Sequence, residues 1–204
     1  MSPFVLLALA YLLGSIPSAY LAGKAFRGID LRQHGSGNLG ATNVYRVLGW
    51  RIALLVFVVD VAKGAVPVLV FPRWVPATSA AHWAIAFGIA AIIGHVRPVF
   101  LLWKRGGKGV ATAAGVFFAL APFAALAATV IWGLVFYRWS YVSLASLSAA
   151  IALPAGAAVG YGAGSPVFVL SVLVCVLVFW THRSNIGRLR RGQELHFNQK
   201  QKSS

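Results

Sequence analysis

Long apolar segments recur along the whole chain and constrain its fold more than any other feature. They cover residues 3–22, 52–72, 83–103, 109–137, 140–160 and 166–181. A helix needs about 20 mostly apolar residues to cross the hydrocarbon core of a bilayer, and these segments reach or approach that length. Only 10% of the 204 residues are charged, against about a quarter in soluble domains. The sequence therefore predicts an all-α, polytopic integral membrane protein with one domain over residues 1–204.

The chain is strongly basic, with a formal charge of +15 from 18 Lys and Arg against three acids. The cations gather in residues 24–51, in residues 97–108 and after residue 181. Cytoplasmic loops of membrane proteins carry such an excess, so we expect all three regions in the cytoplasm. An anionic substrate is a second explanation for the charge, and a nucleic-acid partner is not expected. Cys175 is the only cysteine, so a disulfide within the chain is excluded.

The number of membrane crossings follows from this charge distribution. If residues 97–108 and the C-terminal region share a face, an even number of crossings must separate them, yet only three apolar segments lie between. Segment 109–137 is long and contains Pro122, which breaks or kinks a helix. A break there predicts seven crossings, with the N-terminus and loops 73–82 and 161–165 outside and the C-terminus cytoplasmic. The alternative is five crossings. Residues 195–204 are expected to form a disordered basic tail.

The first polar motif is "GSGNLGATNVYR", residues 35–46. It matches G-x-G-x-x-G, but a dinucleotide site needs a strand before the glycines and a helix after them in a βαβ unit. Here a membrane span follows instead, so we take that match as accidental. Glycines that reach positive φ leave backbone amides open to a phosphate, and arginine can bind phosphate with two parallel hydrogen bonds. The candidate ligands are Ser36, Gly37, Asn38, Gly40, Thr42, Asn43 and Arg46.

The second motif is "RGGKGVAT", residues 105–112. Three glycines, Gly106, Gly107 and Gly109, surround Lys108, and an apolar helix is predicted to begin near Val110. Amides and the positive dipole end at a helix start, together with a lysine, favour an anion. Thr112 is expected to add a hydroxyl from the first turn. The spacing is not that of a Walker A loop.

The third motif is "HRSNIGRLRRGQE", residues 182–194. His182 and Asn185 are three residues apart, which places them on one face of a helix. A histidine at a membrane boundary is suited to binding or proton transfer. Glu194 is expected to pair with an arginine of another loop.

A fourth polar stretch, "DVAKG", lies inside the second predicted span and places Asp60 and Lys63 one turn apart. Buried charges in a bilayer are costly and are usually paired. We therefore expect a mutual ion pair, and support of the functional site is the alternative.

These motifs resemble those of the bacterial acyl-phosphate:glycerol-3-phosphate acyltransferase family (PlsY). That family carries "GSGN-GATN--R", "GGKGVAT" and "H--NI-RL--G-E" in this order, and "GSIPSAYL" and "DVAKG" also match family positions. The resemblance implies a seven-helix enzyme of the bacterial inner membrane with its active site at the cytoplasmic face. It also implies that Ser36, Lys108, His182 and Asn185 are catalytic.

The activity implied by the resemblance is transfer of a fatty acyl group from acyl phosphate to the 1-hydroxyl of glycerol 3-phosphate. Lysophosphatidic acid and inorganic phosphate would be the products, in phospholipid biosynthesis, with membrane lipid around the protein. No cofactor and no metal are expected. The proton acceptor is either His182 or a phosphate oxygen of a substrate. The competing function is a transporter or channel for a phosphorylated organic anion. Such a protein is expected to bind its substrate near the bilayer midplane, whereas the polar motifs here gather at one face.

Overall fold

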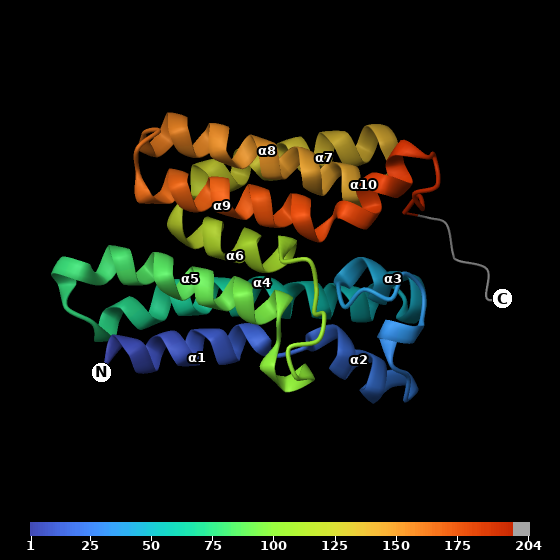
Figure 1. The fold of residues 1–204 in the computed structure, drawn as a ribbon, viewed down its shortest axis with the longest axis horizontal. Coiled ribbons are helices and arrows are strands. Elements are labelled where there is room, and N and C mark those ends of the chain that lie inside the picture. Colours follow the sequence, from blue (N-terminus) through green and yellow to red (C-terminus); the bar gives the residue numbers. More distant parts are fainter. Residues whose placement is uncertain (198–204) are drawn as a thin grey trace. The chain divides into compact units, whose positions relative to one another are not determined.

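The computed structural model describes residues 1–197, and every regular element in that range is a helix (Figure 1). This confirms the predicted all-α class. The α-helices are α1 (Pro3–Ser15), α2 (Ser18–Arg27), α3 (Ala41–Leu48), α4 (Trp50–Val70), α5 (Ala80–Val96), α6 (Val110–Leu120), α7 (Pro122–Trp139), α8 (Val142–Tyr161), α9 (Pro166–Thr181) and α10 (Arg183–Arg190).

Several of these helices are suited to cross a bilayer. Four helical stretches in the described residues are long and apolar enough for this, namely Trp50–Trp74, Ala77–Leu101, Pro122–Trp139 and Val142–Tyr161. Two bent pairs pass the same test when each is taken as one span: α1 with α2, bent by 40°, and α9 with α10, bent by 60°. The apolar helix α6 has only 11 residues, about 16 Å at 1.5 Å per residue. The chain is thus a multi-pass membrane protein.

Prolines set several of the helix boundaries. The predicted break at Pro122 is confirmed, since α6 ends at Leu120 and α7 begins at Pro122. The apolar segment over residues 3–22, expected as the first span, is not one continuous helix. Helix α1 ends at Ser15 and α2 begins at Ser18, because Pro17 has no amide to donate and also disfavours helical backbone at the residue before it. The third apolar segment likewise leaves the helix at Val96, just before Arg97 and Pro98.

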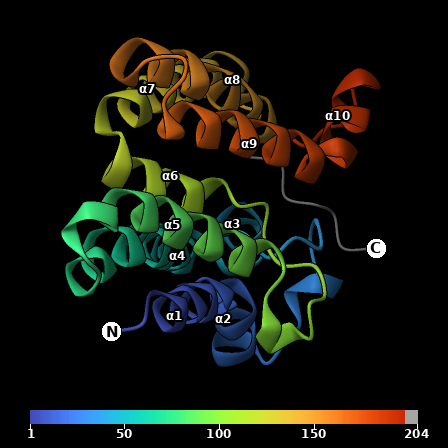
Figure 2. The same cartoon turned by 60° about the vertical axis from the view of Figure 1, so that its left-hand side comes forward.

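The chain divides into two compact units, and the division falls within α6. The first unit comprises Met1–Val116, and the second begins at Phe117. Both are drawn in Figures 1 and 2, and each is described here by itself.

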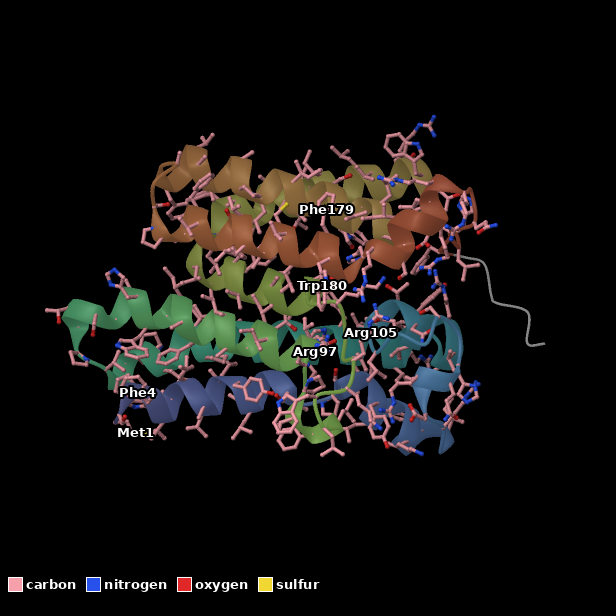
Figure 3. The ribbon with its side chains drawn as sticks, viewed as in Figure 1. Met1, Phe4, Arg97, Arg105, Phe179 and Trp180 are labelled. Atoms are coloured by element: carbon pink, nitrogen blue, oxygen red, sulfur yellow. The ribbon has the colours of Figure 1, made fainter. Side chains whose placement is uncertain are left out.

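In the first unit, α5 packs against both α1 and α4 through very close helix contacts. A side chain at Gly14 would collide with the backbone of Ala91, and one at Gly94 would collide with Tyr11 and Ser15. Small residues at helix crossings let the backbones approach in this way. Arg97 and Arg105 lie at the end of the α1–α5 pair opposite Met1 and Phe4 (Figure 3).

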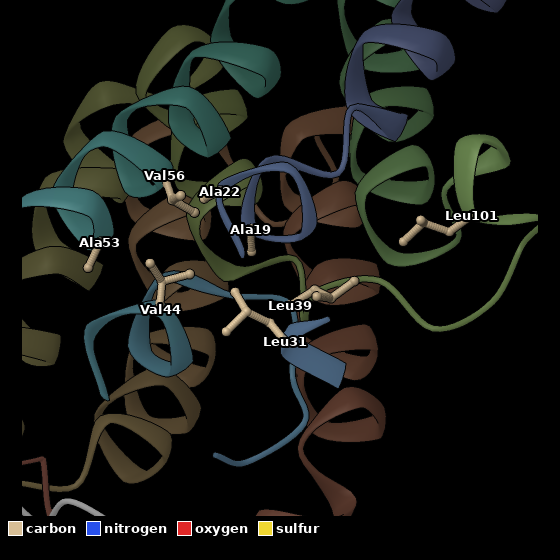
Figure 4. Close-up of a cluster of buried hydrophobic side chains, with 8 residues drawn as sticks. All are labelled: Ala19, Ala22, Leu31, Leu39, Val44, Ala53, Val56 and Leu101. Atoms are coloured by element: carbon tan, nitrogen blue, oxygen red, sulfur yellow. The ribbon is translucent and has the colours of Figure 1, made fainter. Parts of the chain in front are cut away.

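A buried apolar cluster in the first unit supports the first polar motif. It joins α2, α3 and α4 to the loop between α2 and α3 and to Leu101, which follows α5, and Figure 4 shows these side chains. The loop contributes Leu31 and Leu39, which are 0% and 3% exposed. The other members are Ala19, Ala22, Val44, Ala53, Val56 and Leu101. The glycine-rich loop is therefore anchored at both ends by buried leucines.

In the second unit, α8 packs against both α7 and α9 (Figure 2). The chain returns after α10 to contact the α7–α8 turn: the amide of Phe197 donates to the carbonyl of Ser140 over 2.9 Å, and the ring of His196 lies 4.2 Å from that of Tyr141. The predicted disordered tail is thereby corrected for residues 195–197. Its remainder, residues 198–204, lies outside the described residues.

Candidate active site

Asn43 organises the loop of the first motif. Its side chain is 1% exposed. The side-chain oxygen accepts from the amide of Ser36 over 2.8 Å, and Nδ2 donates to the carbonyls of Leu31 and His34 over 3.3 and 3.0 Å. These bonds hold its amide inside the loop, and the phosphate contact expected for Asn43 stays a prediction. A neutral amide suits this place, since it both donates and accepts.

Two of the three glycines in this loop have the predicted left-handed backbone. Gly35 has φ = 60° and Gly37 has φ = 68°, a region that costs other residues strain. Gly40 is different, with an extended φ of −133°. Its carbonyl accepts from the amides of Asn43 and Val44, which starts α3.

The outer side of the loop carries the other residues of the first motif. Ser36 is exposed, and Asn38, Thr42 and Arg46 are half-buried. Thr42 and Arg46 are four residues apart on α3, so they share one face of this helix. The amide of Ser36 is occupied by Asn43, which leaves its hydroxyl as the group able to meet a substrate.

Arg32, a second arginine in this region, is occupied by a carboxylate. Its guanidinium donates three bonds of 2.6 to 3.1 Å to the Asp30 carboxylate. The hydrogen bonds from this guanidinium hold the pKa of Asp30 at about 2. Arg32 is therefore engaged by a carboxylate at neutral pH.

The second motif folds back onto the end of α5. The amide of Gly106 donates to the carbonyl of Val96 over 3.1 Å, and that of Gly107 donates to the carbonyl of His95 over 3.2 Å. Both amides are thus occupied by the end of α5, and the phosphate contact expected for these glycines stays a prediction. A side chain at Gly107 would collide with the imidazole of His95 and the carbonyl of Leu39. The first two motifs therefore touch within the first unit.

Lys108 follows these glycines directly and precedes α6. Gly109 has φ = 87°, and α6 begins at Val110 as predicted. Lys108 is half-buried, while Lys104 and Arg105 are exposed. Thr112 is 0% exposed, and a side chain at Gly64 of α4 would collide with its carbonyl. The Thr112 hydroxyl is therefore buried in the helix packing, and its expected phosphate contact stays a prediction.

The predicted ion pair in α4 is confirmed. Lys63 Nζ lies 2.8 Å from Asp60 Oδ1, and the two side chains are 5% and 2% exposed. Ser18 of α2 donates to the same oxygen over 2.6 Å. His95 of α5 also faces this oxygen, at 3.6 Å from Nδ1. His95 was not expected at the site, because its apolar surroundings in α5 give no periodic signal in the sequence.

The third motif lies in the second unit, where α9 bends into α10. His182 sits at the junction and is 3% exposed. Its carbonyl accepts from the amide of Ile186, so Asn185 lies within the first turn that His182 starts. His182 Nδ1 is 2.8 Å from the carbonyl of Val178. A carbonyl only accepts, so Nδ1 carries the proton and Nε2 of the neutral ring is the basic nitrogen.

Glu194 is the centre of this motif. Its Oε1 accepts from Ser143 over 2.7 Å and from Asn185 Nδ2 over 2.5 Å, and its Oε2 accepts from Arg188 over 2.7 Å. The arginine comes from the same motif, so the expected pairing with another loop is wrong. Burial alone raises the pKa of Glu194, but the bonds from Asn185, Ser143 and Arg188 outweigh it and hold the pKa below its usual value.

Glu194→Gln is expected to lower the free energy of unfolding by about 1.5–3 kcal/mol at neutral pH, the usual contribution of a hydrogen bond to a charged group. A carboxyl whose pKa is lowered by folding stabilises above its unfolded pKa of about 4.3. That contribution is lost as the pH falls through the folded value. Thermal unfolding in detergent at about pH 7 and about pH 3 checks this, because the difference between wild type and variant must shrink in acid. Gln193→Ala, at an exposed neighbour, is the control, and a constant difference would contradict the assignment.

Comparison with known proteins shows the family of this chain. The model of the family described as glycerol-3-phosphate acyltransferase matches residues 4–192. The chain belongs to the glycerol-3-phosphate acyltransferase family. Two relatives that carry this family name come from Geotalea daltonii and a Synechococcus species. The first is 47% identical over 95% of this chain and 96% of its own, and the second is 46% identical over 100% and 99%.

Two crystal structures from the glycerol-3-phosphate acyltransferase family share the fold. Both are of PlsY, described as an integral membrane glycerol 3-phosphate acyltransferase. The glycerol 3-phosphate form is 41% identical with a TM-score of 0.87, covering 97% of this chain and 96% of that one. The lysophosphatidic acid form is 40% identical with a TM-score of 0.83, covering 96% and 95%. The resemblance seen in the sequence motifs is confirmed.

Proposed function

We propose that this protein transfers a fatty acyl group from acyl phosphate to the 1-hydroxyl of glycerol 3-phosphate, in phospholipid biosynthesis. The observation that carries the proposal is the contact of two basic, glycine-rich loops in the first unit, where Gly107 lies against the carbonyl of Leu39. Two such loops suit two phosphate-bearing substrates. The family membership and the titles of the two related crystal structures support the same reaction.

Phosphate binding is assigned to Arg46 and Lys108, with Ser36, Asn38 and Thr42 as neutral donors. Arg46 offers a planar fork that matches two phosphate oxygens, and Lys108 offers a point charge. The hydroxyl oxygen of glycerol 3-phosphate attacks the acyl carbon and forms the ester, while the bond from that carbon to the phosphate oxygen breaks. Phosphate is already a good leaving group, so positioning and charge stabilisation carry the rate.

The attacking hydroxyl must also lose its proton, and two acceptors remain. One is Nε2 of His182, which the bond from Nδ1 to Val178 makes the basic nitrogen. The other is a substrate phosphate oxygen, whose second pKa is about 6 by analogy with phosphorylated side chains. We favour the phosphate, because it arrives at the reacting atoms with the substrate. His182 and Asn185 then act by hydrogen bonding.

His182→Gln tests this choice, because glutamine keeps a donor but cannot take a proton. With phosphate as the base we expect a moderate loss of kcat, below about 10²-fold, and a pH–rate profile still set by phosphate ionisation. Steady-state kinetics across the neutral pH range provide the measurement. A loss of about 10⁴-fold, the upper end for a lost general base, would instead make His182 the base.

The proposed topology has seven crossings, an outer N-terminus and a cytoplasmic C-terminus in the bacterial inner membrane. Its support is the four long spans, the two bent pairs and the short helix α6. Single cysteines in a Cys175→Ala background are expected to react with an impermeant reagent from outside at 73–82 and 161–165. Labelling from outside at 24–51, 104–108 or the C-terminal region would contradict the shared cytoplasmic face.

The identity of the acyl donor can be tested with a simple activity assay. Purified protein is expected to acylate glycerol 3-phosphate with acyl phosphate and not with acyl-CoA, and to remain active in EDTA. Acyl-CoA as the better donor, or inactivation by EDTA with recovery on adding a divalent ion, would overturn it. A transporter would move glycerol 3-phosphate into vesicles without forming a product.

A further inference from the structure

A buried polar cluster lies behind the loop that presents Lys108, and the proposed chemistry does not use it. It joins three helices of the first unit, with Ser18 from α2, Asp60 and Lys63 from α4, and His95 from α5. Asp60 is 1% exposed, and Lys63 and His95 are each 6% exposed. Ionisable side chains within membrane-spanning helices are costly, and they mark functional positions more often than chance would place them there.

Asp60 is the fixed point of this cluster. Its Oδ1 accepts from Ser18 over 2.6 Å and pairs with Lys63 Nζ at 2.8 Å. Lys63 also donates to the carbonyl of Ile16 over 2.8 Å, in the break between α1 and α2. The opposite charges balance, and their bonds tie α4 to the start of α2.

His95 lies between Asp60 and the loop that carries Lys108. On one side, Nδ1 lies 3.6 Å from Asp60 Oδ1 and makes no hydrogen bond within the described residues. On the other side, a side chain at Gly107 would overlap the ring at Nε2. The backbone of His95 contacts the loop as well, because its carbonyl accepts from the amide of Gly107 over 3.2 Å. The ring of His95 therefore faces the Asp60 carboxylate on one edge and the backbone of Gly107 on the other.

We propose that His95 is a positioning residue, which transmits the fixed geometry of the Ser18–Asp60–Lys63 cluster to the loop that carries Lys108. Lys108 follows Gly107 directly, so a displacement of Gly107 displaces the backbone of Lys108 with it. A misplacement of about 1 Å is enough to lower turnover by about 10²-fold. The inference rests on the proposed function, because it assigns Lys108 to a phosphate.

Two substitutions test separately the edge of the His95 ring that faces Asp60 and the edge that faces Gly107. His95→Asn keeps a polar atom near the place of Nδ1, facing Asp60, and removes the part of the ring that meets Gly107. His95→Gln extends a polar atom toward the place of Nε2 and withdraws the group that faces Asp60. His82→Gln, at the exposed beginning of the same helix, is the matched control.

The readout is the dissociation constant for inorganic phosphate, titrated against the full chain in detergent, with the unliganded melting temperature measured separately. We expect His95→Asn and His95→Gln each to weaken phosphate binding by about tenfold to 10²-fold, the range for loss of positioning, and His82→Gln to bind as the wild type does. A histidine with only a structural role would lower the melting temperature and leave the phosphate affinity of the folded chain unchanged.

Wild-type phosphate affinity in both His95 variants would overturn the inference, as would a wild-type chain that binds no phosphate. If neither variant folds, Gly107→Ala presses on the ring from the loop side, and unchanged phosphate binding in that variant contradicts the proposal. The titration requires no acyl transfer. Absence of turnover in the wild type therefore counts against the proposed function and leaves the test of His95 in place.

Discussion

Replacing Lys108 with alanine is expected to lower kcat/KM by about 10²–10³-fold, the usual effect of removing one preorganised group that stabilises developing charge. Lys108 lies between the packed glycines of the second motif and the start of α6. Its ammonium is therefore held by a backbone that has little freedom to move. The measurement is steady-state kinetics with both phosphate-bearing substrates, on protein whose melting temperature matches the wild type.

Lys104→Ala is the matched control, because Lys104 lies in the same loop but is exposed. It is expected to retain wild-type kinetics. Equal losses in the two variants would mean that the loop supplies only a general positive potential. Unchanged kinetics in Lys108→Ala would remove this lysine from the site.

Arg46→Lys is expected to reduce kcat/KM by about 10–10²-fold although the charge is kept. Hydrogen bonds to charged groups contribute about 1.5–3 kcal/mol, and a lysine cannot reproduce the two parallel bonds of a planar guanidinium. Arg46 shares a helix face with Thr42, which places the fork beside a hydroxyl. Kinetics at varied glycerol 3-phosphate and acyl phosphate show which substrate it holds.

The control for this variant is Arg27→Lys, at the exposed end of α2, and it is expected to be neutral. Near-normal kinetics in Arg46→Lys would show that a point charge suffices there. In that case the bidentate role of Arg46 would be wrong, although a charge requirement would still be visible in Arg46→Ala.

Much of the fold could be predicted from the sequence because the bilayer restricts the alternatives. A span must be long, apolar and helical, and Pro122 gave the position of the break between α6 and α7. The division of residues 3–22 at Pro17 could not be predicted from apolar composition, because the segment is almost continuously apolar on both sides of this proline. Pro17 and Pro122 interrupt their helices for the same reason, because proline lacks an amide hydrogen and clashes with the preceding turn.

The candidate site was predicted less completely. Residue type identified the motifs, but not which way each polar group faces. The bonds of Asn43 within its own loop, and those of the Gly106 and Gly107 amides to α5, could not be predicted from the sequence. His95 was missed because its partner, Asp60, is 35 positions away in the numbering. Contacts of this kind depend on helix packing, which periodicity does not encode.

The most direct measurement of the central claim follows both products of one reaction. Purified protein is given glycerol 3-phosphate and an acyl phosphate with heavy oxygen in the bridging position between the acyl carbon and phosphorus. Attack at the acyl carbon predicts lysophosphatidic acid and inorganic phosphate in equal amounts, with all of the label in the phosphate. Label retained in free fatty acid, with phosphate transferred to glycerol 3-phosphate or to water, would contradict acyl transfer.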